Sequence, residues 1–257
     1  MTIDRRSALR FGIAAAAALC PLCRIGDARA ASGITWSYEG PNGTDEWGKL
    51  SPDFQACSAS REQTPIDLKD GIRAEPGELA FAYQAAPVRI LNNGHTIQVN
   101  CDAGSKALIV RESYDLLQYH FHHPSEHILE GKRFALELHL VHRNAAGQLA
   151  VVGVFIQAGE ENPALQALWS VMPTTAGAEQ ATNVSVNPGR LLPANRTYFR
   201  YFGSLTTPPC SDGVLWTMFK EPISASEEQI LQFAKLFPMN ARPVQPLHRR
   251  FLLQSGS

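Results

Sequence analysis

The chain has 257 residues, of which 44% are hydrophobic and 18% are charged, and its 23 basic and 24 acidic side chains leave a formal net charge of -1. This composition is typical of a globular domain with a substantial core and excludes an intrinsically disordered chain. The balanced charge provides no basic surface for nucleic acid or an anionic membrane, so we expect neither as a partner.

The first thirty residues have the pattern of an export signal. Arg5-Arg6 precedes a weakly apolar stretch over 11–19, and Ala28-Arg29-Ala30 then forms an A-x-A cleavage pattern. The apolar stretch is shorter than the about 20 residues that a membrane span requires. The sequence therefore predicts a signal peptide over 1–30, of the twin-arginine type, with cleavage near Ala30 and a periplasmic or secreted product without a membrane span.

Cleavage there leaves one domain over 31–257, with 18 basic and 22 acidic residues and a net charge of -4. This domain keeps three cysteines, Cys57, Cys101 and Cys210. An oxidising compartment permits one disulfide among them and leaves one thiol. From the cysteine count alone, all three pairings remain open.

Short segments rich in Val, Ile, Leu, Phe and Tyr follow, separated by turn sequences such as Asn92-Asn93-Gly94. They predict strands over 88–91, 96–100, 107–110, 116–122, 134–142 and 149–157. Helical signals are few and predict helices over 163–171 and 225–237, the first with Pro163 near its start and the second ending before Pro238. We therefore expect a single, mainly β domain with a mostly antiparallel sheet and a few short helices.

Three histidines on two neighbouring predicted strands form the most informative pattern. His120 and His122 lie two residues apart, so on a strand both rings project from one face. The turn Glu130-Gly131-Lys132 returns the chain, and His139 on the next strand then reaches the same point. Three neutral imidazoles with a fourth open position are the ligand set of a catalytic zinc site, so we predict one Zn²⁺ per chain.

A ring that binds a metal normally donates its other N–H to an acceptor outside the ligand set. Gln118 and Glu137 each lie two residues from a predicted ligand and therefore on the same face. Either side chain is suited to accept such a hydrogen bond.

These segments and several others resemble the alpha carbonic anhydrases, in particular their secreted bacterial members, in order and spacing. The resemblance rests on seven blocks that run from Gln63 to Pro243, and Trp36-Ser37-Tyr38 extends it towards the N-terminus. The blocks are Gln63-Thr64-Pro65-Ile66-Asp67, Asn92-Asn93-Gly94-His95, Gln118-Tyr119-His120-Phe121-His122, Ser125-Glu126-His127, Glu137-Leu138-His139-Leu140-Val141-His142, Gly203-Ser204-Leu205-Thr206-Thr207-Pro208-Pro209 and Asn240-Ala241-Arg242-Pro243.

The resemblance implies a large central twisted sheet with a conical cavity and zinc at its base. It also implies reversible hydration of carbon dioxide to bicarbonate and a proton by attack of zinc-bound hydroxide. Thr206 is expected to accept a hydrogen bond from that hydroxide and to donate one to Glu126. His95 matches the family's proton shuttle to buffer, and Asn240 is expected to support a zinc ligand.

The remaining family positions follow from the same resemblance. The residues expected to contact the substrate are Val141, Val151, Leu205, Thr207, Val214 and Trp216. Secreted family members also imply a disulfide between Cys57 and Cys210, which leaves Cys101 as a buried thiol within a strand. Sulfonamides and anions are expected to inhibit, and a homodimer is allowed.

The other histidines have structural interpretations. His142, three residues beyond His139, is expected on the opposite face of its strand as a core histidine. His127 is expected as an internal hydrogen-bond partner, and His248 at the surface. His123 and Pro124 depart from residues that are common in relatives, so we expect a remodelled rim there.

Two other functions fit parts of the pattern. The spacing His120-x-His122-x3-Glu126 resembles the metal motif of cupins, with Glu126 as a ligand of iron or manganese. A carbonic anhydrase-like domain that only binds a partner is the second alternative. Such non-catalytic members have usually lost a zinc-binding histidine, whereas all three are present here.

Overall fold

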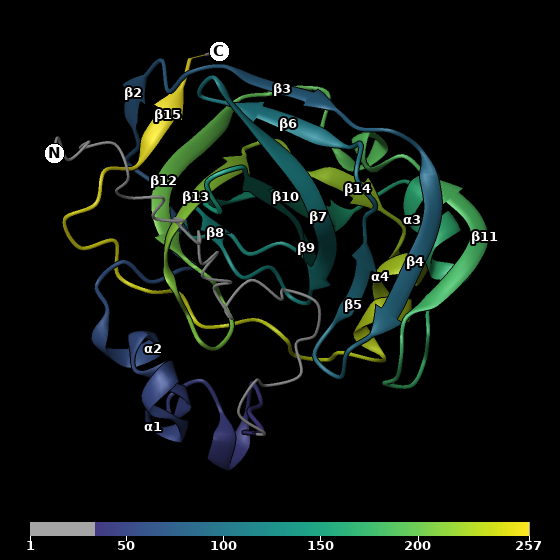
Figure 1. Ribbon diagram of the computed structural model, residues 1–257, viewed down its shortest axis with the longest axis horizontal. Helices are drawn as coiled ribbons and strands as arrows, with labels where there is room; N and C mark the ends of the chain where they lie inside the picture. Colours follow the sequence, from purple (N-terminus) through teal and green to yellow (C-terminus); the bar gives the residue numbers. More distant parts are fainter. Residues whose placement is uncertain (1–33, 257) are drawn as a thin grey trace, which may run out of the picture.

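The computed structural model describes residues 34–256, and a 13-stranded mixed sheet forms most of it (Figure 1). Most neighbouring strands are antiparallel, as predicted, and the parallel pairs in this sheet are β10 with β13, β10 with β14, and β15 with β2. In spatial order the main path is β11 (Gln180–Val186), β4 (Ala86–Asn92), β5 (Ile97–Asn100), β7 (Glu112–His122), β9 (Leu136–Asn144), β10 (Leu149–Ala158), β13 (Asp212–Phe219), β12 (Tyr198–Ser204), β15 (Leu253–Ser255) and β2 (Ile72–Ala74).

Three further strands join this sheet beside the main path. They are β3 (Leu79–Ala82), β6 (Lys106–Ile109) and β14 (Ile223–Ala225). A separate parallel pair is formed by β1 (Asp67–Leu68) and β8 (Ile128–Leu129). The six predicted strands correspond to β4, β5, β6, β7, β9 and β10, whereas the other strands lie outside the predicted ranges. Five of those others are only two or three residues long, too short for an alternating pattern.

The helices are short and lie at the periphery of the sheet (Figure 1). The predicted helix over 163–171 is α3 (Pro163–Trp169), and the one over 225–237 is α4 (Glu227–Ala234). Ser226 caps α4 in a capping box with Gln229, which explains why the helix begins after it. The remaining helical turns are η1 (Gly40–Asn42), α1 (Trp47–Leu50), η2 (Pro52–Phe54), α2 (Ala56–Ala59) and η3 (Pro188–Leu191).

The two faces of β9 belong to different apolar clusters. Leu138 and Leu140 lie in the larger cluster, which also contains side chains of α3 and α4. Val141 lies in a second cluster that is built mainly from β10, β12 and β13. The polar side chains Glu137 and His139 alternate with the leucines, so they share the face of Val141.

A β-bulge in β7 aligns its polar side chains with those of β9. Leu116 pairs with His142, but Gln118 pairs with the adjacent Val141, so Leu117 is an extra residue in β7. Beyond this point the ladder is regular and pairs His120 with His139. The bulge therefore lets Leu116 pack with Tyr119 and Phe121 in the larger cluster while Gln118 and His120 face the other side.

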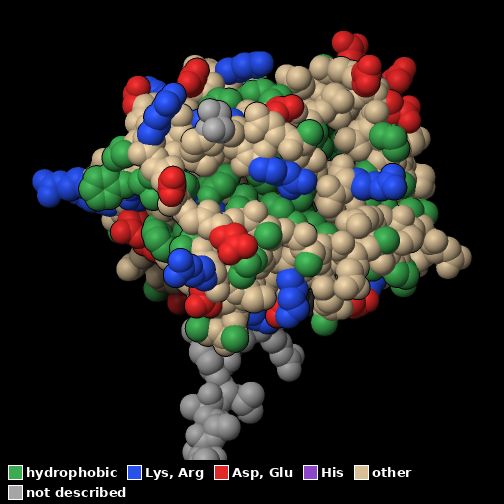
Figure 2. Space-filling model, turned by 90° about the horizontal axis from the view of Figure 1, so that it is seen from above, with side chains coloured by type: hydrophobic (Ala, Val, Ile, Leu, Met, Phe, Trp, Pro, Cys, Tyr) green, Lys and Arg blue, Asp and Glu red, His purple; other side chains and the backbone are tan. Residues whose placement is uncertain are grey.

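The face drawn in Figure 2 carries acidic and basic side chains intermixed, without a broad patch of one sign. Within residues 34–256, no helix has the length and apolar character needed to cross a bilayer. The predicted signal peptide over 1–30 lies outside the described residues.

Candidate metal centre

The structure brings the three predicted metal ligands together. His120 and His139 are paired across β7 and β9, and His122 is paired with Glu137. One ligand atom from each ring of His120, His122 and His139 lies within 4.8 Å of the others. His122 and His139 are buried and His120 is half-buried. The alternation predicted from sequence therefore converges three imidazoles on one point.

In each ring, the outer nitrogen, which points away from the centre, lies within hydrogen-bond distance of an acceptor. Nδ1 of His120 lies 2.8 Å from Gln118 Oε1, and Nε2 of His139 lies 2.6 Å from Glu137 Oε1. Nδ1 of His122 lies 2.7 Å from the backbone oxygen of Asn240. An acceptor forms a hydrogen bond only with the nitrogen that carries the proton, so the second nitrogen of each neutral ring keeps its lone pair.

This donor set fits a zinc ion. Nε2 of His122 is buried and has no hydrogen-bond partner among residues 34–256, as expected for an atom whose partner is a metal. Burial, together with the neighbouring imidazoles, lowers the pKa of His120, and burial lowers the pKa of His122. Neutral imidazoles are the form that binds zinc, and three of them leave a fourth position for solvent.

Glu137 connects the metal site to a buried polar chain. Its carboxylate accepts the backbone N–H of His127 at 2.8 Å, and its Oε1 lies 2.7 Å from Nδ1 of the same ring. Burial acts to raise the pKa of Glu137, but hydrogen bonds to the rings of His127 and His139 hold that pKa well below its usual range. Glu137 is therefore ionised and fixes the tautomer of His139. His127 is an internal hydrogen-bond partner, as predicted.

The series of buried, hydrogen-bonded polar groups extends from His127 to the loop that carries Thr206. Nε2 of His127 lies 2.6 Å from the hydroxyl of Tyr201, which is 3.3 Å from Thr64 Oγ1. Thr64 Oγ1 accepts the backbone N–H of Ser204 at 3.0 Å, directly before the loop. The sequence alone does not indicate Thr64 and Tyr201 as partners of the site, because no local pattern relates residues so far apart in the chain.

Glu126 lies beside the metal ligands. Its Oε1 accepts the backbone N–H of Arg242 at 2.8 Å, and its Oε2 lies 3.5 Å from His122 Nε2 and 4.0 Å from His139 Nδ1. Oε2 is buried and has no hydrogen-bond partner among the described residues, so the expected bond from Thr206 does not form in this structure. Thr206 is itself buried, and its link to Glu126 remains a prediction.

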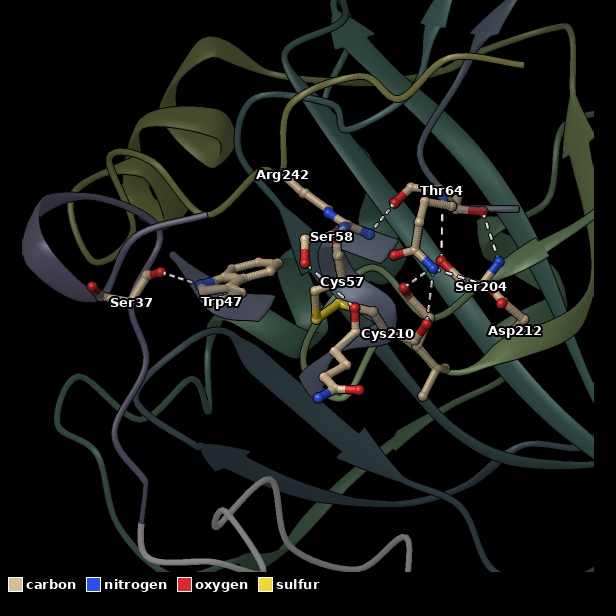
Figure 3. The surroundings of a disulfide bond; sticks show 12 residues. Ser37, Trp47, Cys57, Ser58, Thr64, Ser204, Cys210, Asp212 and Arg242 are labelled. Carbon is tan, nitrogen blue, oxygen red and sulfur yellow. Dashed lines mark hydrogen bonds between the residues drawn. A yellow bond between two sulfur atoms is a disulfide. The ribbon is translucent and has the colours of Figure 1, made fainter. Parts of the chain in front are cut away.

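A disulfide between Cys57 and Cys210 holds the Thr206 loop against α2, as the resemblance implied (Figure 3). The backbone N–H of Cys210 also donates to the oxygen of Thr207 at 2.9 Å, within the same loop. Gln63 Nε2 donates to the oxygen of Cys210 at 3.0 Å. The loop is thus attached to the N-terminal part of the fold by a covalent bond and a hydrogen bond.

Cys101 differs from the expectation in its place and its burial. Cys101 follows the last residue of β5 instead of lying inside the strand, and it is half-buried, not fully buried. Its backbone N–H still donates to Leu117, next to the bulge, where regular pairing of β5 ends. Burial raises the pKa of the Cys101 thiol to about 12, so it is protonated at neutral pH.

His95, the predicted proton shuttle, lies in the turn between β4 and β5 and is half-buried. Its ring stacks on Trp36, and its backbone N–H donates to Asn93 Oδ1 at 2.9 Å. Burial lowers the pKa of His95 below its ordinary value. The sequence alone identified both residues in family blocks but not the stacking between them.

The predicted substrate wall lies next to the histidines. Four of its residues are buried in the second apolar cluster, namely Val141, Val151, Val214 and Trp216. Leu205 is partly buried and packs against this cluster. The indole of Trp216 lies 4.9 Å from the ring of His139 and donates through Nε1 to the oxygen of Ser204 at 2.9 Å. Thr207 is half-buried in the adjacent loop.

The remaining histidines do not belong to the cluster of metal ligands. His142 is buried on the opposite face of β9, as predicted, where its Nε2 lies 2.7 Å from the hydroxyl of Tyr83. Nδ1 of His123 lies 3.0 Å from the oxygen of Pro238. His248 is exposed, as predicted.

Known proteins match this chain over most of its length. The family model described as "Eukaryotic-type carbonic anhydrase" matches residues 42–256. The chain belongs to the alpha carbonic anhydrase family. It is 43% identical to a carbonic anhydrase of Nostoc sp. over 99% of this chain and 98% of that protein, and 41% identical to one of Pectobacterium carotovorum over 88% and 93%.

A solved alpha carbonic anhydrase, that of Thermovibrio ammonificans in complex with the inhibitor sulfanilamide, has the same fold. It superimposes with a TM-score of 0.83 at 41% identity and covers 86% of this chain and 99% of that one. The chain is thus a carbonic anhydrase, and the cupin alternative is set aside because the family match covers both the histidines and the Thr206 loop.

Proposed function

We propose that this carbonic anhydrase hydrates carbon dioxide reversibly with one zinc ion held by His120, His122 and His139. The observation that carries the proposal is the arrangement of hydrogen bonds around the three rings. Gln118, the backbone oxygen of Asn240 and Glu137 each accept a hydrogen bond from one outer nitrogen, which leaves the inner nitrogens free to bind a metal. Carbonic anhydrases are the standard example of a zinc enzyme with three histidine ligands.

When bound, zinc supplies an acidified water whose pKa is about 7, the value known for carbonic anhydrase, so that hydroxide is available at neutral pH. Thr206 would orient the nucleophile by accepting its hydrogen bond, and would donate its own O–H to Glu126. The backbone N–H of Arg242 donates to Glu126 Oε1 and keeps the carboxylate aimed at the site. An oriented nucleophile close to its target lowers the entropic part of the barrier.

Carbon dioxide is nonpolar and binds on the apolar wall beside His139. The wall is formed by Val141, Val151 and Trp216 with their neighbours in the second cluster, and it offers no charge that would attract water. Because water competes poorly for such a surface, the substrate remains close to the nucleophile while bicarbonate, which is charged, leaves readily.

His95 accepts the proton that each turnover releases and passes it to buffer. A histidine is suited to this step because its pKa lies near the working pH. The half-buried ring of His95, in a turn close to the surface, can exchange its proton with solvent. Its lowered pKa favours release of the proton over retention.

We also propose export after cleavage near Ala30, with 1–30 as the signal, and inhibition by sulfonamides and anions. The Cys57–Cys210 disulfide supports an oxidising compartment. The sulfonamide proposal is supported by the inhibitor bound in the Thermovibrio relative.

Stopped-flow measurement of carbon dioxide hydration, with and without a sulfonamide, tests the function directly. We expect a rate that requires zinc, one zinc per chain by metal analysis, and loss of the rate with the inhibitor. A folded protein that lacks zinc, or that binds it without hydrating carbon dioxide, would show a non-catalytic domain. His95→Ala should lower the rate in dilute buffer and leave zinc binding intact, with recovery on adding imidazole.

A further inference from the structure

Asn240 joins the metal strand to the segment that carries His95. Its side chain is 1% exposed and makes three hydrogen bonds to backbone groups of two different segments. Nδ2 donates to the oxygen of His95 at 2.9 Å and to that of Phe121 at 3.1 Å. Oδ1 accepts the N–H of His123 at 2.6 Å. We infer that Asn240 is a positioning residue for proton transfer, which acts by fixing His95 relative to the metal site.

Two different parts of Asn240 serve the two segments. Its backbone oxygen is the acceptor for His122 Nδ1, whereas its side-chain amide holds the carbonyl of His95. A change of side chain keeps the backbone oxygen, so the contact with His95 can be removed while the acceptor of the metal ligand remains.

The backbone of His95 is held at both of its polar groups. Its N–H donates to Asn93 Oδ1 at 2.9 Å, and its C=O accepts from Asn240 Nδ2 at 2.9 Å. With the backbone fixed, the imidazole moves only by rotation about its side-chain torsions. Asn240 holds the His95 carbonyl directly to the segment of the metal ligands, whereas Asn93 belongs to the same turn as His95 and gives no such link.

A second hydrogen-bonded contact runs beside this one. Thr96 Oγ1 donates to the oxygen of Phe121 at 2.5 Å, the same carbonyl that accepts from Asn240. Thr96 thus ties the start of β5 to β7, but it leaves the His95 carbonyl untouched. Proton transfer depends steeply on the separation and alignment of donor and acceptor, so the loss of one anchor next to His95 has a kinetic effect.

The inference rests on the proposed role of His95, and the experiment separates the two. Asn240→Ser is made in the zinc-loaded enzyme and in the His95→Ala background. We expect kcat in dilute buffer to fall about tenfold, whereas kcat/KM and zinc content stay unchanged. Added imidazole should restore kcat. In the His95→Ala background, Asn240→Ser should lower kcat no further, because coupled residues act through one step.

Asn187→Ser is the matched control. Asn187 also uses its side chain to hold backbone groups, those of Gly189 and Tyr83, but within residues 34–256 it makes no hydrogen bond to β7 or His95. It should leave kcat in dilute buffer unchanged. A similar loss of kcat in this control would show that general loosening of the fold, not positioning of His95, explains the effect.

Three results would overturn the inference. Equal falls in kcat and kcat/KM, or loss of zinc, would show that Asn240 acts only on His122. An unchanged kcat would show that its side chain does not matter for proton transfer.

If Asn240→Ser does not fold, Asn240→Asp is the alternative variant. It keeps the acceptor for His123 and removes the donor to His95, and it must give the same selective fall in kcat. If His95→Ala alone leaves kcat unchanged, the proposed shuttle fails instead.

Discussion

The imidazole of His95 lies flat on the indole of Trp36, with ring centroids 3.8 Å apart and an angle of 6° between the planes. Tyr38 approaches the same imidazole edge-on, with a centroid distance of 6.5 Å. The two aromatic residues bury one face of a ring that we propose to exchange a proton on every turnover. Burial of this kind disfavours the charged imidazolium.

Trp36→Ala should therefore raise the pKa of His95 towards its ordinary value of about 6.5. The direction follows because burial is the cause of the lowered pKa, and removal of the indole exposes the ring. An NMR titration of the His95 ring measures the change. A pKa that stays the same or falls would mean that the indole is not what buries the ring.

Gln118→Ala should weaken zinc binding about 10- to 100-fold, the usual effect of losing a partner of a metal-bound histidine. Gln118 Oε1 is the acceptor that keeps the proton of His120 on Nδ1. Competition with a chelator measures the affinity. Gln98→Ala is the matched control, because Gln98 lies opposite His120 on β5 but bonds to Asn100 and not to an imidazole. Equal losses in both variants would contradict the role of Gln118.

Cys101 should react slowly with a thiol reagent at pH 8 in the folded protein and quickly after unfolding. Burial raises the pKa of its thiol to about 12, so little of the reactive thiolate is present until unfolding returns the pKa to its ordinary value of about 8.5. Titration of unreduced, denatured mature protein should find one thiol per chain. Three thiols would show that the Cys57–Cys210 bridge is absent in solution.

Reduction of that bridge should lower the free energy of unfolding by about 2–5 kcal/mol. The bridge joins residues 153 positions apart, so it restricts a large part of the unfolded chain. Urea unfolding with and without reductant measures the effect, and Cys101→Ser, which leaves the bridge intact, should show the same loss on reduction. An unchanged midpoint in urea would contradict the prediction.

The pH dependence of stability should contain a contribution from His142. Burial lowers its pKa to about 4, whereas in the unfolded chain the pKa is about 6.5. Between these two values the unfolded chain binds more protons than the folded one, so stability is lost as the pH falls through this window. The size of the contribution is on the order of 3 kcal/mol.

His142→Gln removes this titration. The free energy of unfolding of the variant should therefore decline less than that of the unaltered protein as the pH falls from 7 to about 4. Urea unfolding at several pH values gives both curves. Parallel curves would mean that His142 is not buried as a neutral ring.

Much of the candidate site could be predicted from local sequence. The rings of His120 and His122, the return strand with His139, and the acceptors Gln118 and Glu137 all follow from the two-residue period of a strand. The same period placed His142 on the opposite face. It did not reveal the bulge at Leu117, because an inserted residue leaves no mark in a run of apolar and aromatic side chains.

By itself, the sequence determined which side chains share a face within each strand, since that depends only on the backbone geometry of neighbouring residues. The tertiary structure alone decided which distant segments complete the site. Arg242 donates to Glu126 across 116 positions, and Tyr201 contacts Thr64 across 137. Such contacts depend on how the whole sheet and its loops pack, and the packing energy that selects them is distributed over the entire core instead of residing in any local pattern.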